Sequence, residues 1–429
     1  MGQPILAGLD MIPYWSKMTG FFETSRVKPV NILMLVGLLA VIWGRRWAEV
    51  QRAKKARKIL LESGANFPEI EPLEEFEWEK TEPLQLRPYK PKYHLTMALE
   101  NLDPSELIPM DNTYKERIDL RRRLLKEHRD VVLGVNKDKS GEEDPRTRAA
   151  VSELYEFVLG TYLPTRYPKM FKLVEANFET GKTILVRNQV TGEMLPTTLN
   201  PNRPTITALE TLAKTVDEEM LILLPEIKAS NHSEKTSEKR TRERSKPRSD
   251  PSAPDGEGNR YVLEAYTTCF PSGFDTRTKL GKRLDEIHIP VPGYKQKLEK
   301  SMDRFFDKLE VGKFVKRANW TLTTDADLFA AFGGIHGQQG ECMKPLEELD
   351  LDNTFLRCER QTLYRLPTSG ALVFSFHTYR YPIQQIKDEG SAEDLALAID
   401  GFEAGNVPLM ARYKRVPAWG EAVKEYLRS

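Results

Sequence analysis

Cysteine is scarce in this chain of 429 residues. Only Cys269, Cys342 and Cys358 occur, far apart and odd in number. A disulfide scaffold needs paired cysteines, and a cysteine-ligated zinc or iron–sulfur centre needs about four thiolates. The sequence therefore excludes both kinds of site and favours a reducing compartment.

An excess of charge of one sign is also missing. The chain has 64 lysines and arginines against 63 aspartates and glutamates, which gives a net charge of +1. This balance provides no global electrostatic field that would attract a polyanion. The sequence also has no evident Gly-rich nucleotide fingerprint. We therefore expect no nucleic-acid partner and no flavin or iron–sulfur motif in this chain.

One long apolar run lies near the N-terminus. Residues 29–44 carry no charge, and Trp43 and Trp47 lie at the C-terminal end of the run. As a helix this stretch would measure about 24 Å, and flanking arginines would extend its reach toward the roughly 30 Å of a hydrocarbon core. We predict a single transmembrane anchor over residues 29–47, preceded by an N-terminal tail over residues 1–28.

Basic residues predict the orientation of this anchor. Seven lysines and arginines lie between Arg45 and Lys58, whereas three lie between Lys17 and Lys28. Positive charge is retained on the cytosolic side of a membrane. The sequence therefore predicts a single-pass membrane protein whose bulk faces the cytosol.

Composition divides the rest of the chain into segments. Residues 48–92 are charged and rich in proline, which is typical of a tether. A folded domain is expected over residues 93–385, followed by a helical C-terminal extension over 386–429. Within the domain, residues 228–260 are almost entirely small, polar and charged, so we expect a disordered insert there.

Helices and strands are mixed in the expected domain. Apolar strands at 221–224 and 261–263 flank the insert, so they predict neighbouring strands joined by a long loop. Residues 355–365 and 371–381 flank a turn of Pro, Thr, Ser and Gly, which predicts a hairpin. Residues 294–309 have helical spacing of apolar side chains. Without regular strand–helix–strand alternation, the pattern predicts an α+β fold with an antiparallel sheet.

His288 is the most informative single residue. It lies in the apolar segment 287–294, where Pro290 and Pro292 fix φ and favour an extended backbone. Such a segment could present a neutral imidazole to an apolar cavity, which suits a haem iron better than a solvated acid–base site. The alternative from the residues alone is a histidine satisfied within the core.

A series of short motifs resembles one known family. The motifs, in chain order, are Tyr93-His94-Leu95-Thr96-Met97, Leu102-Asp103-Pro104, Arg121-Arg122-Arg123-Leu124-Leu125, Cys269-Phe270-Pro271-Ser272, Lys279-Leu280-Gly281, Ile287-His288-Ile289-Pro290-Val291-Pro292-Gly293, Asp303-Arg304-Phe305-Phe306, Asn319-Trp320-Thr321-Leu322 and Glu359-Arg360-Gln361-Thr362-Leu363-Tyr364-Arg365-Leu366-Pro367. Together they resemble the haem-dependent oxidative N-demethylase family, at its α-subunit-like domain, over about residues 85 to 385.

The resemblance implies a PAS-like haem-binding domain that carries haem b. In the bacterial enzyme, O₂ is used to oxidise a small secondary amine with release of formaldehyde, and electrons arrive from NADPH through flavin and a [2Fe–2S] centre. This chain departs from that arrangement because it lacks the cysteine cluster and the nucleotide fingerprint. The resemblance therefore implies an external flavin or iron–sulfur reductase as a partner.

A haem site needs an axial ligand, an apolar slot and groups for two propionates. His288 is the candidate metal ligand, and His377 on the second hairpin strand is its rival. Arg360 and Arg365 are candidates to pair with propionates, because guanidinium binds carboxylates in a bidentate manner. Trp320 is a candidate for the cavity wall. Glu359 or Gln361 could orient a substrate amine.

Two other functions stay open at this point. An N-terminal anchor followed by Asp325-Ala326-Asp327 is typical of glycosyltransferases that hold a divalent cation. Alternatively, Thr323-Thr324-Asp325 resembles a helix N-cap before the apolar residues 328–332, with acidic residues on the first turn. The second alternative is a membrane-anchored haem or ligand sensor without catalysis, which the missing electron-transfer motifs permit.

Overall fold

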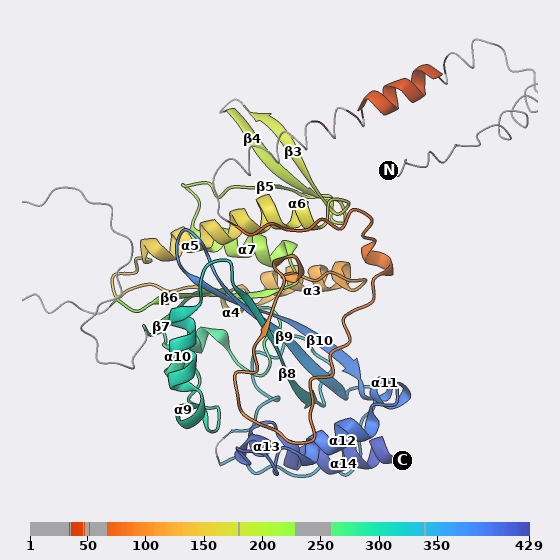
Figure 1. The fold of residues 1–429 in the computed structure, drawn as a ribbon, viewed down its shortest axis with the longest axis vertical. Coiled ribbons are helices and arrows are strands. Elements are labelled where there is room, and N and C mark those ends of the chain that lie inside the picture. The colour runs from red at the N-terminus through yellow and green to blue at the C-terminus, as the bar shows by residue number, and fades with distance from the viewer. Residues whose placement is uncertain are drawn as a thin grey trace, which may run out of the picture. The chain divides into compact units, whose positions relative to one another are not determined.

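The computed structural model describes residues 67–178, 181–227, 259–338 and 340–429, together with positions 34, 36–45, 47 and 51. It divides into two units, residues 1–59 and 60–429. The second unit contains all the strands and most of the helices that the structure describes (Figure 1).

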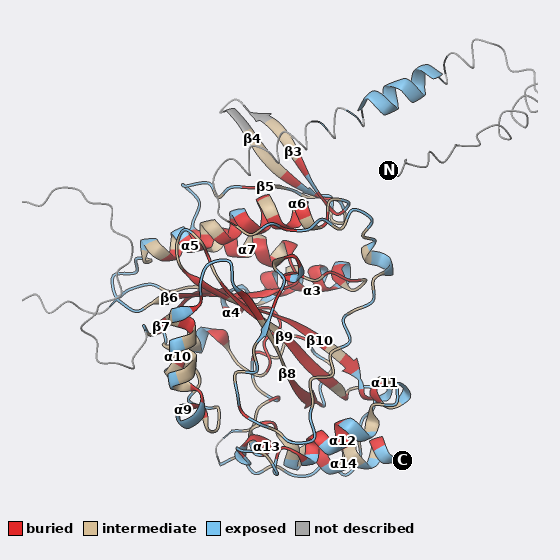
Figure 2. Cartoon of the chain, viewed as in Figure 1, coloured by how far each residue is buried: buried red, intermediate tan, exposed pale blue. Residues whose placement is uncertain are grey.

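An antiparallel sheet forms the centre of the second unit. Within the described residues it has seven strands in the order β1-β8-β9-β10-β6-β7-β2, and each neighbouring pair is antiparallel. The strands are β1 (Glu100–Asn101), β2 (Leu133–Val135), β6 (Glu219–Pro225), β7 (Tyr261–Thr267), β8 (Phe314–Thr323), β9 (Phe355–Arg365) and β10 (Leu372–Pro382). Most of their residues are buried (Figure 2). The predicted α+β class is confirmed; the PAS-like assignment stays a prediction.

The predicted hairpin is present as β9 and β10. These strands pair from Arg365 opposite Leu372 to Phe355 opposite Pro382. Gly370 has φ of +69°, a value that favours glycine, and it lies in the turn. Glu153 of α5 (Pro145–Glu156) accepts hydrogen bonds of 2.7 Å from the backbone N–H groups of Thr368 and Ser369. The turn is therefore attached to a helix that lies more than 200 positions earlier.

The predicted insert joins two paired strands, β6 and β7. Their register runs from Met220 opposite Thr267 to Pro225 opposite Tyr261. The strands on both sides of the insert are thus neighbours in one sheet, as the sequence predicts. Residues 228–258 lie outside the described residues, so the predicted disorder is not tested.

Helices cover both faces of the sheet. Helices α5 and α7 (Thr205–Thr215) pack against β6 and β7 on the side opposite to α10 (Glu299–Lys308), as Figure 1 shows. Beside them lie a three-stranded sheet, β3-β4-β5, and further helices. These elements are β3 (Phe171–Phe178), β4 (Gly181–Asn188), β5 (Met194–Pro196), η2 (Pro104–Glu106), α3 (Tyr114–Glu127), α4 (Arg129–Val132), η3 (Phe157–Tyr162) and α6 (Leu163–Arg166).

The other face of the sheet is covered by short helices and by the C-terminal region. The elements are η4 (Thr276–Lys279), α8 (Leu284–Ile287), α9 (Tyr294–Lys297), α10, α11 (Ile383–Asp388), α12 (Ala392–Asp400), α13 (Leu409–Tyr413) and α14 (Val416–Arg428). The helix predicted over 294–309 is present as α9 and α10, which are interrupted at Leu298. Helices α11 to α14 share a buried cluster with β8, β9 and β10, so the C-terminal extension is part of the folded unit.

Residues 67–92, predicted as part of a tether, instead lie against the domain. Phe67 stacks on Phe157 with ring centroids 4.2 Å apart. The backbone N–H of Leu73 donates to the carbonyl of Arg166 at 2.8 Å, and Ile70 is buried. Among its described residues the segment has one helical turn, η1 (Trp78–Lys80), and no strand. Its composition is that of a tether, but its side chains pack against the domain.

The N-terminal unit includes part of the predicted anchor. Residues 36–45 are helical, and their large apolar side chains are exposed. Within the residues that can be described, no helix combines the length and apolar character needed to cross a membrane. The anchor over residues 29–47 is therefore not shown.

The predicted helix over residues 328–332 is absent, so the N-cap assigned to Asp325 is wrong. Asp325 instead accepts a hydrogen bond of 2.8 Å from the backbone N–H of Asp327. Arg357 binds the carbonyl oxygens of Asp327 and Leu328, and Ala330 forms a bridge with Ser272. These contacts hold the segment in an irregular, partly extended form where a helix would break them.

Candidate functional site

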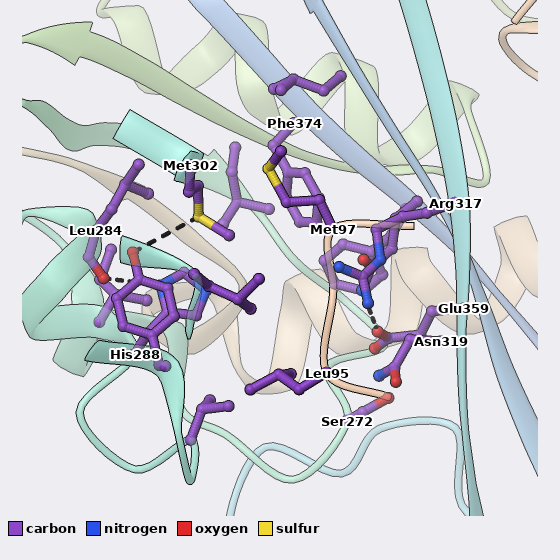
Figure 3. A pocket seen from close by; sticks show the side chains of 18 of the residues that line it. Leu95, Met97, Ser272, Leu284, His288, Met302, Arg317, Asn319, Glu359 and Phe374 are labelled. Carbon is purple, nitrogen blue, oxygen red and sulfur yellow. Dashed lines mark hydrogen bonds between the residues drawn. The ribbon is translucent and has the colours of Figure 1, made fainter. Parts of the chain in front are cut away.

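A cavity of about 290 Å³ lies between the sheet and the short helices α8 to α10. Figure 3 shows it from close by, with His288 on one side and Arg317 and Glu359 on the other. Its apolar lining comes from β6 to β10, the helices, the segment 93–99 and short irregular segments: Leu95, Met97, Leu99, Leu221, Leu223, Leu263, Phe274, Leu284, Ile287, Val291, Leu298, Met302, Phe306, Val315, Leu363, Phe374 and Phe376. A mainly apolar cavity with a few polar groups is typical of a ligand site.

His288 faces this cavity from the C-terminal end of α8. Its Nδ1 lies 2.7 Å from the carbonyl oxygen of Leu284, which is a hydrogen-bond acceptor. This contact requires the proton on Nδ1, so the lone pair of Nε2 is free to bind a metal. The ring stacks on Tyr294, with centroids 4.5 Å apart and planes 10° apart. Burial lowers the pKa of His288 to about 4, so the imidazole is neutral at pH 7.

A turn, rather than the predicted extended segment, places His288. The backbone N–H of Val291 donates to the His288 carbonyl at 2.9 Å, and Gly293 has φ of +76°. A β-carbon at Gly293 would also lie 2.9 Å from a methyl group of Val407. The prolines on either side of Val291 therefore stabilise a compact turn, with glycine required at its end.

The register of β8 and β9 gathers polar side chains on one wall. Arg317 pairs with Gln361 and Asn319 pairs with Glu359, and all four line the cavity. Gln361 donates to Oε2 of Glu359 at 2.8 Å. Oε1 of Glu359 and Nε of Arg317 are buried and have no hydrogen-bond partner among the described residues. Burial lowers the pKa of the Arg317 guanidinium.

Two further cations and a second histidine complete the polar lining. Lys414 is 2% exposed, and its ammonium donates to Oδ1 of Asn319 at 3.2 Å and to the carbonyl of Trp320. Burial lowers the pKa of Lys414 to about 8. His336 stacks on Tyr413 with centroids 4.4 Å apart, and burial lowers its pKa to about 3. Lys279 donates to the carbonyl of Ile287 at 3.3 Å and lies near the His288 side of the lining.

Three of the predicted site residues lie outside the cavity lining. Arg360 points to the other side of β9 and donates to the carbonyls of Leu107 and Glu106. Arg365 donates to the carbonyls of Phe306 and Leu309, at the C-terminal end of α10. Trp320 is buried and packs against Phe402, with ring centroids 5.0 Å apart. The roles predicted for these residues stay predictions.

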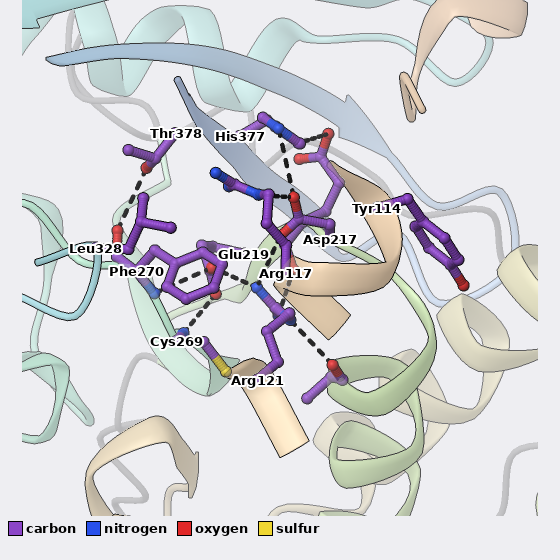
Figure 4. Close-up of polar contacts among 12 residues, drawn as sticks. Tyr114, Arg117, Arg121, Asp217, Glu219, Cys269, Phe270, Leu328, His377 and Thr378 are labelled. Carbon is purple, nitrogen blue, oxygen red and sulfur yellow. Dashed lines mark hydrogen bonds and ion pairs between the residues drawn. The ribbon is translucent and has the colours of Figure 1, made fainter. Parts of the chain in front are cut away.

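His377 lies in a second buried cluster, away from the cavity lining (Figure 4). Its neighbour Phe376 lines the cavity, and side chains alternate along a strand, so His377 faces the opposite side of the sheet. Its Nε2 is 3.4 Å from Oδ2 of Asp217, and Asp217 pairs with Arg117. Burial lowers the pKa of His377, and the Asp217 carboxylate opposes that shift. The structure thus brings His288, and not His377, to the cavity.

The family model described as haem-dependent oxidative N-demethylase, alpha subunit-like, matches residues 98–424. The chain belongs to this family. The match begins before α3 and ends within α14, so this N-demethylase-like unit includes the C-terminal helices as well as the sheet and the cavity.

The N-demethylase-like site contains residues that the sequence analysis did not select. Arg317, Lys414 and His336 were not candidates, although Arg317 lies two positions before the Asn319-Trp320 motif. Alternation along β8 could have placed Arg317 beside Asn319 on one face. Lys414 and His336 lie in turns and irregular segments, which carry no such periodicity. For the Asp325-Ala326-Asp327 motif, no group of three or more metal-binding side chains occurs within the described residues, and family membership favours haem chemistry over sugar transfer.

Proposed function

We propose that this chain binds haem b in the cavity, with Nε2 of His288 as the iron ligand. The observation that carries the proposal is the 2.7 Å contact between Nδ1 of His288 and the Leu284 carbonyl. A metal-binding histidine usually donates its other N–H to such an acceptor, which fixes the tautomer and orients the ring. Stacking on Tyr294 restricts the same ring further.

The rest of the lining is chemically suited to haem. Most of the side chains around His288 are apolar, which suits a macrocycle and limits access of water. The two propionates require cations or other donors. Lys279, Arg317 and Lys414 line the cavity, and none of the three has a carboxylate of the described residues within 4.0 Å. The lining has three cations and haem has two propionates. One cation therefore remains when each propionate pairs with one cation.

We further propose oxidative N-demethylation of a small secondary amine. Haem would supply the redox centre for O₂ chemistry. The balanced reaction converts the amine, O₂, two electrons and two protons into the demethylated amine, formaldehyde and water. Glu359 would accept a hydrogen bond from the amine nitrogen and hold it in place. The electrons would come from a separate flavin or iron–sulfur reductase, because the sequence has no motif for either centre.

An absorption spectrum tests the haem proposal. The purified protein, expressed with an adequate supply of haem, should show a Soret band. His288→Ala should abolish or shift this band, whereas His94→Ala, at an exposed position, should leave it unchanged. His336→Ala tests whether the second histidine of the lining is the iron ligand. Absence of a Soret band in the wild-type protein would remove the proposal, and a larger effect of His336→Ala would transfer the ligand role to His336.

Formaldehyde release separates an enzyme from a sensor. The haem-loaded protein should release formaldehyde from a secondary amine when O₂ and a reductant are supplied. If haem binds and is reduced but no formaldehyde forms from any amine tested, the alternative of a haem or ligand sensor is favoured.

We also propose that residues 29–47 anchor the chain in a membrane, with the bulk in the cytosol. Support comes from the uncharged run and from the exposed side chains of Leu38, Leu39 and Trp43. The full chain should stay in the membrane pellet after alkaline carbonate extraction, and a chain that begins at residue 60 should be released. Release of the full chain would contradict the anchor.

A further inference from the structure

Two opposite charges on the cavity wall, those of Arg317 and Glu359, share no hydrogen bond within the described residues, although the Glu359 carboxylate acts on the Arg317 guanidinium through its charge. Arg317 and Glu359 lie on adjacent strands of the sheet, on the same face, two residue pairs apart in the β8–β9 register. Glu359 is 6% exposed, and its Oε1 has no hydrogen-bond partner in the described structure. Nε of Arg317 is likewise buried and unpaired. Unpaired buried atoms also occur elsewhere in the described structure, but these two carry opposite charges and line the same cavity wall, and together they point to a ligand that provides both partners.

The charges of the lining narrow the chemistry of that ligand. The described lining has three cations, Lys279, Arg317 and Lys414, and one carboxylate, Glu359. His288 is assigned to the iron through Nε2, with its Nδ1 bonded to the Leu284 carbonyl, so it is not counted among the cations. His336 stacks on Tyr413 and is neutral, because burial lowers its pKa to about 3. If two haem propionates use two of the cations, one cation and the carboxylate remain. That remainder matches a molecule that carries one negative and one positive charge.

The geometry of the wall indicates which cation remains. Lys279 lies beside His288, since its ammonium donates to the carbonyl of Ile287, the preceding residue. Lys414 uses two of its three N–H donors on Asn319 and the Trp320 carbonyl, so one donor remains for a propionate. Nε of Arg317 has no acceptor among the described residues, and the side chain lies diagonal to Glu359, within reach of one small ligand (Figure 3). Guanidinium also binds a carboxylate through two parallel hydrogen bonds.

We propose that the substrate is a zwitterionic secondary or tertiary amine, an N-methyl amino acid, with its carboxylate on Arg317 and its ammonium on Glu359. This inference rests on the proposed demethylation and specifies its substrate class. Gln361 holds Oε2 of Glu359, so the free Oε1 is directed to the ligand nitrogen. A simple dialkylamine would leave Arg317 unpaired, and a simple carboxylate would leave Glu359 unpaired.

Binding calorimetry on the purified chain tests the substrate class. The ligands are N-methylglycine, dimethylamine and acetate, each titrated into both haem-free and haem-loaded protein. N-methylglycine should bind about tenfold or more tightly than either fragment, because each fragment leaves one buried charge without a partner. Equal affinity for dimethylamine and N-methylglycine would overturn the proposal.

Two substitutions assign the charges. Arg317→Met should reduce the affinity for N-methylglycine to that for dimethylamine, and leave dimethylamine unchanged. Glu359→Gln should weaken both amines and leave acetate unchanged. Arg304→Met and Glu348→Gln remove the same charges at exposed positions, so they should change none of the three affinities. A preference for N-methylglycine that survives Arg317→Met would contradict the assignment.

The alternative carboxylate for Arg317 is a haem propionate, in place of the carboxylate of the amino acid. In that case Arg317→Met would weaken haem binding, measured by Soret titration, and would not change the ratio of affinities for N-methylglycine and dimethylamine. This outcome overturns the zwitterion proposal while haem binding stands. Conversely, a protein without a Soret band that still prefers N-methylglycine would retain the ligand class and lose the proposed haem function.

Discussion

Arg317 differs from Arg357, Arg360 and Arg365, three arginines of the neighbouring strand β9. Arg357 donates to Ser272 and to four carbonyl oxygens, and Arg360 and Arg365 also donate to carbonyls. Those three side chains connect segments of the fold. Arg317 connects nothing within the described structure, and its Nε is buried without an acceptor. A polar group buried without a partner destabilises the fold, which is typical of residues retained for ligand binding.

Replacing Arg317 should therefore stabilise the ligand-free protein. Arg317→Met keeps an unbranched side chain as far as the position of Nε and removes the guanidinium, so the free energy of unfolding should rise by about 1 kcal/mol. Arg360→Met is the matched control. It leaves the carbonyls of Leu107 and Glu106 unpaired, so the free energy of unfolding should fall by about 1–3 kcal/mol. Urea unfolding of both variants measures the two effects. A loss of stability in Arg317→Met would show that Arg317 has a structural role.

The two cavity histidines predict a dependence of stability on pH. Burial lowers the pKa of His288 to about 4 and that of His336 to about 3, whereas an unfolded chain titrates near 6.5. Between about pH 6.5 and pH 4 the unfolded state therefore binds more protons, and stability falls as pH falls.

Urea unfolding at pH 7 and pH 5 measures this loss. The double variant His288→Gln, His336→Gln should lose less stability than the wild type between the two pH values. The comparison is necessary because buried Glu218, whose pKa is raised by burial, changes stability in the opposite direction. An equal loss of stability in both proteins would show that His288 and His336 do not cause this pH dependence.

At the scale of elements, the site depends on the register of three strands. Alternation in β9 predicts that Glu359 and Arg360 face opposite sides, and the structure agrees. The sequence does not indicate which side faces the cavity, because both sides of this sheet are buried. His377 and Phe376 present the same ambiguity on β10. The segment around His288 could be recognised from the sequence, because its prolines and glycine determine the backbone at neighbouring residues. The neighbours of Arg317 could not, because they are brought together only when β8 pairs with β9.

The contact between α5 and the β9–β10 turn should be measurable. Glu153→Ala removes the acceptor for two backbone N–H groups, those of Thr368 and Ser369, and should lower the free energy of unfolding by about 1–3 kcal/mol. Glu156→Ala, at an exposed position on the same helix, should have a small effect. Denaturant unfolding compares the two variants. Similar values for both would indicate that the turn is stable without this contact.

At the scale of the molecule, the folded unit begins earlier than composition suggests. The family match starts at residue 98, yet Phe67, Ile70 and Leu73 already contact the domain. Further along, the backbone N–H of Leu86 donates to the Tyr381 hydroxyl at 3.0 Å. Segment 67–92 thus extends from the helices near Phe157 to the end of β10. Sequence patterns missed it because its contacts are single side chains without a repeating period.

Truncation tests this boundary. A chain that begins at residue 67 should retain the stability of residues 60–429. A chain that begins at Tyr93 should lose about 3 kcal/mol or more, since it exposes apolar surface equal to one or two large side chains. Thermal or urea unfolding of the two chains gives the comparison. Equal stability would show that residues 67–92 contribute little.

Because β6 pairs with β7, the chain should tolerate insertions, deletions and cuts in the connection between these two strands. Pro225 and Tyr261 are partners across the sheet, so the ends of the connection between them are held by the fold itself. The entropy of closing a loop grows only slowly, by about 0.6 kcal/mol for each doubling of its length. The connection is therefore a natural place to insert a reporter domain, to shorten the chain, or to cut it into two complementing halves. The cavity should stay intact, because the side chains that these strands contribute to it, Leu221, Leu223 and Leu263, lie before and after the connection.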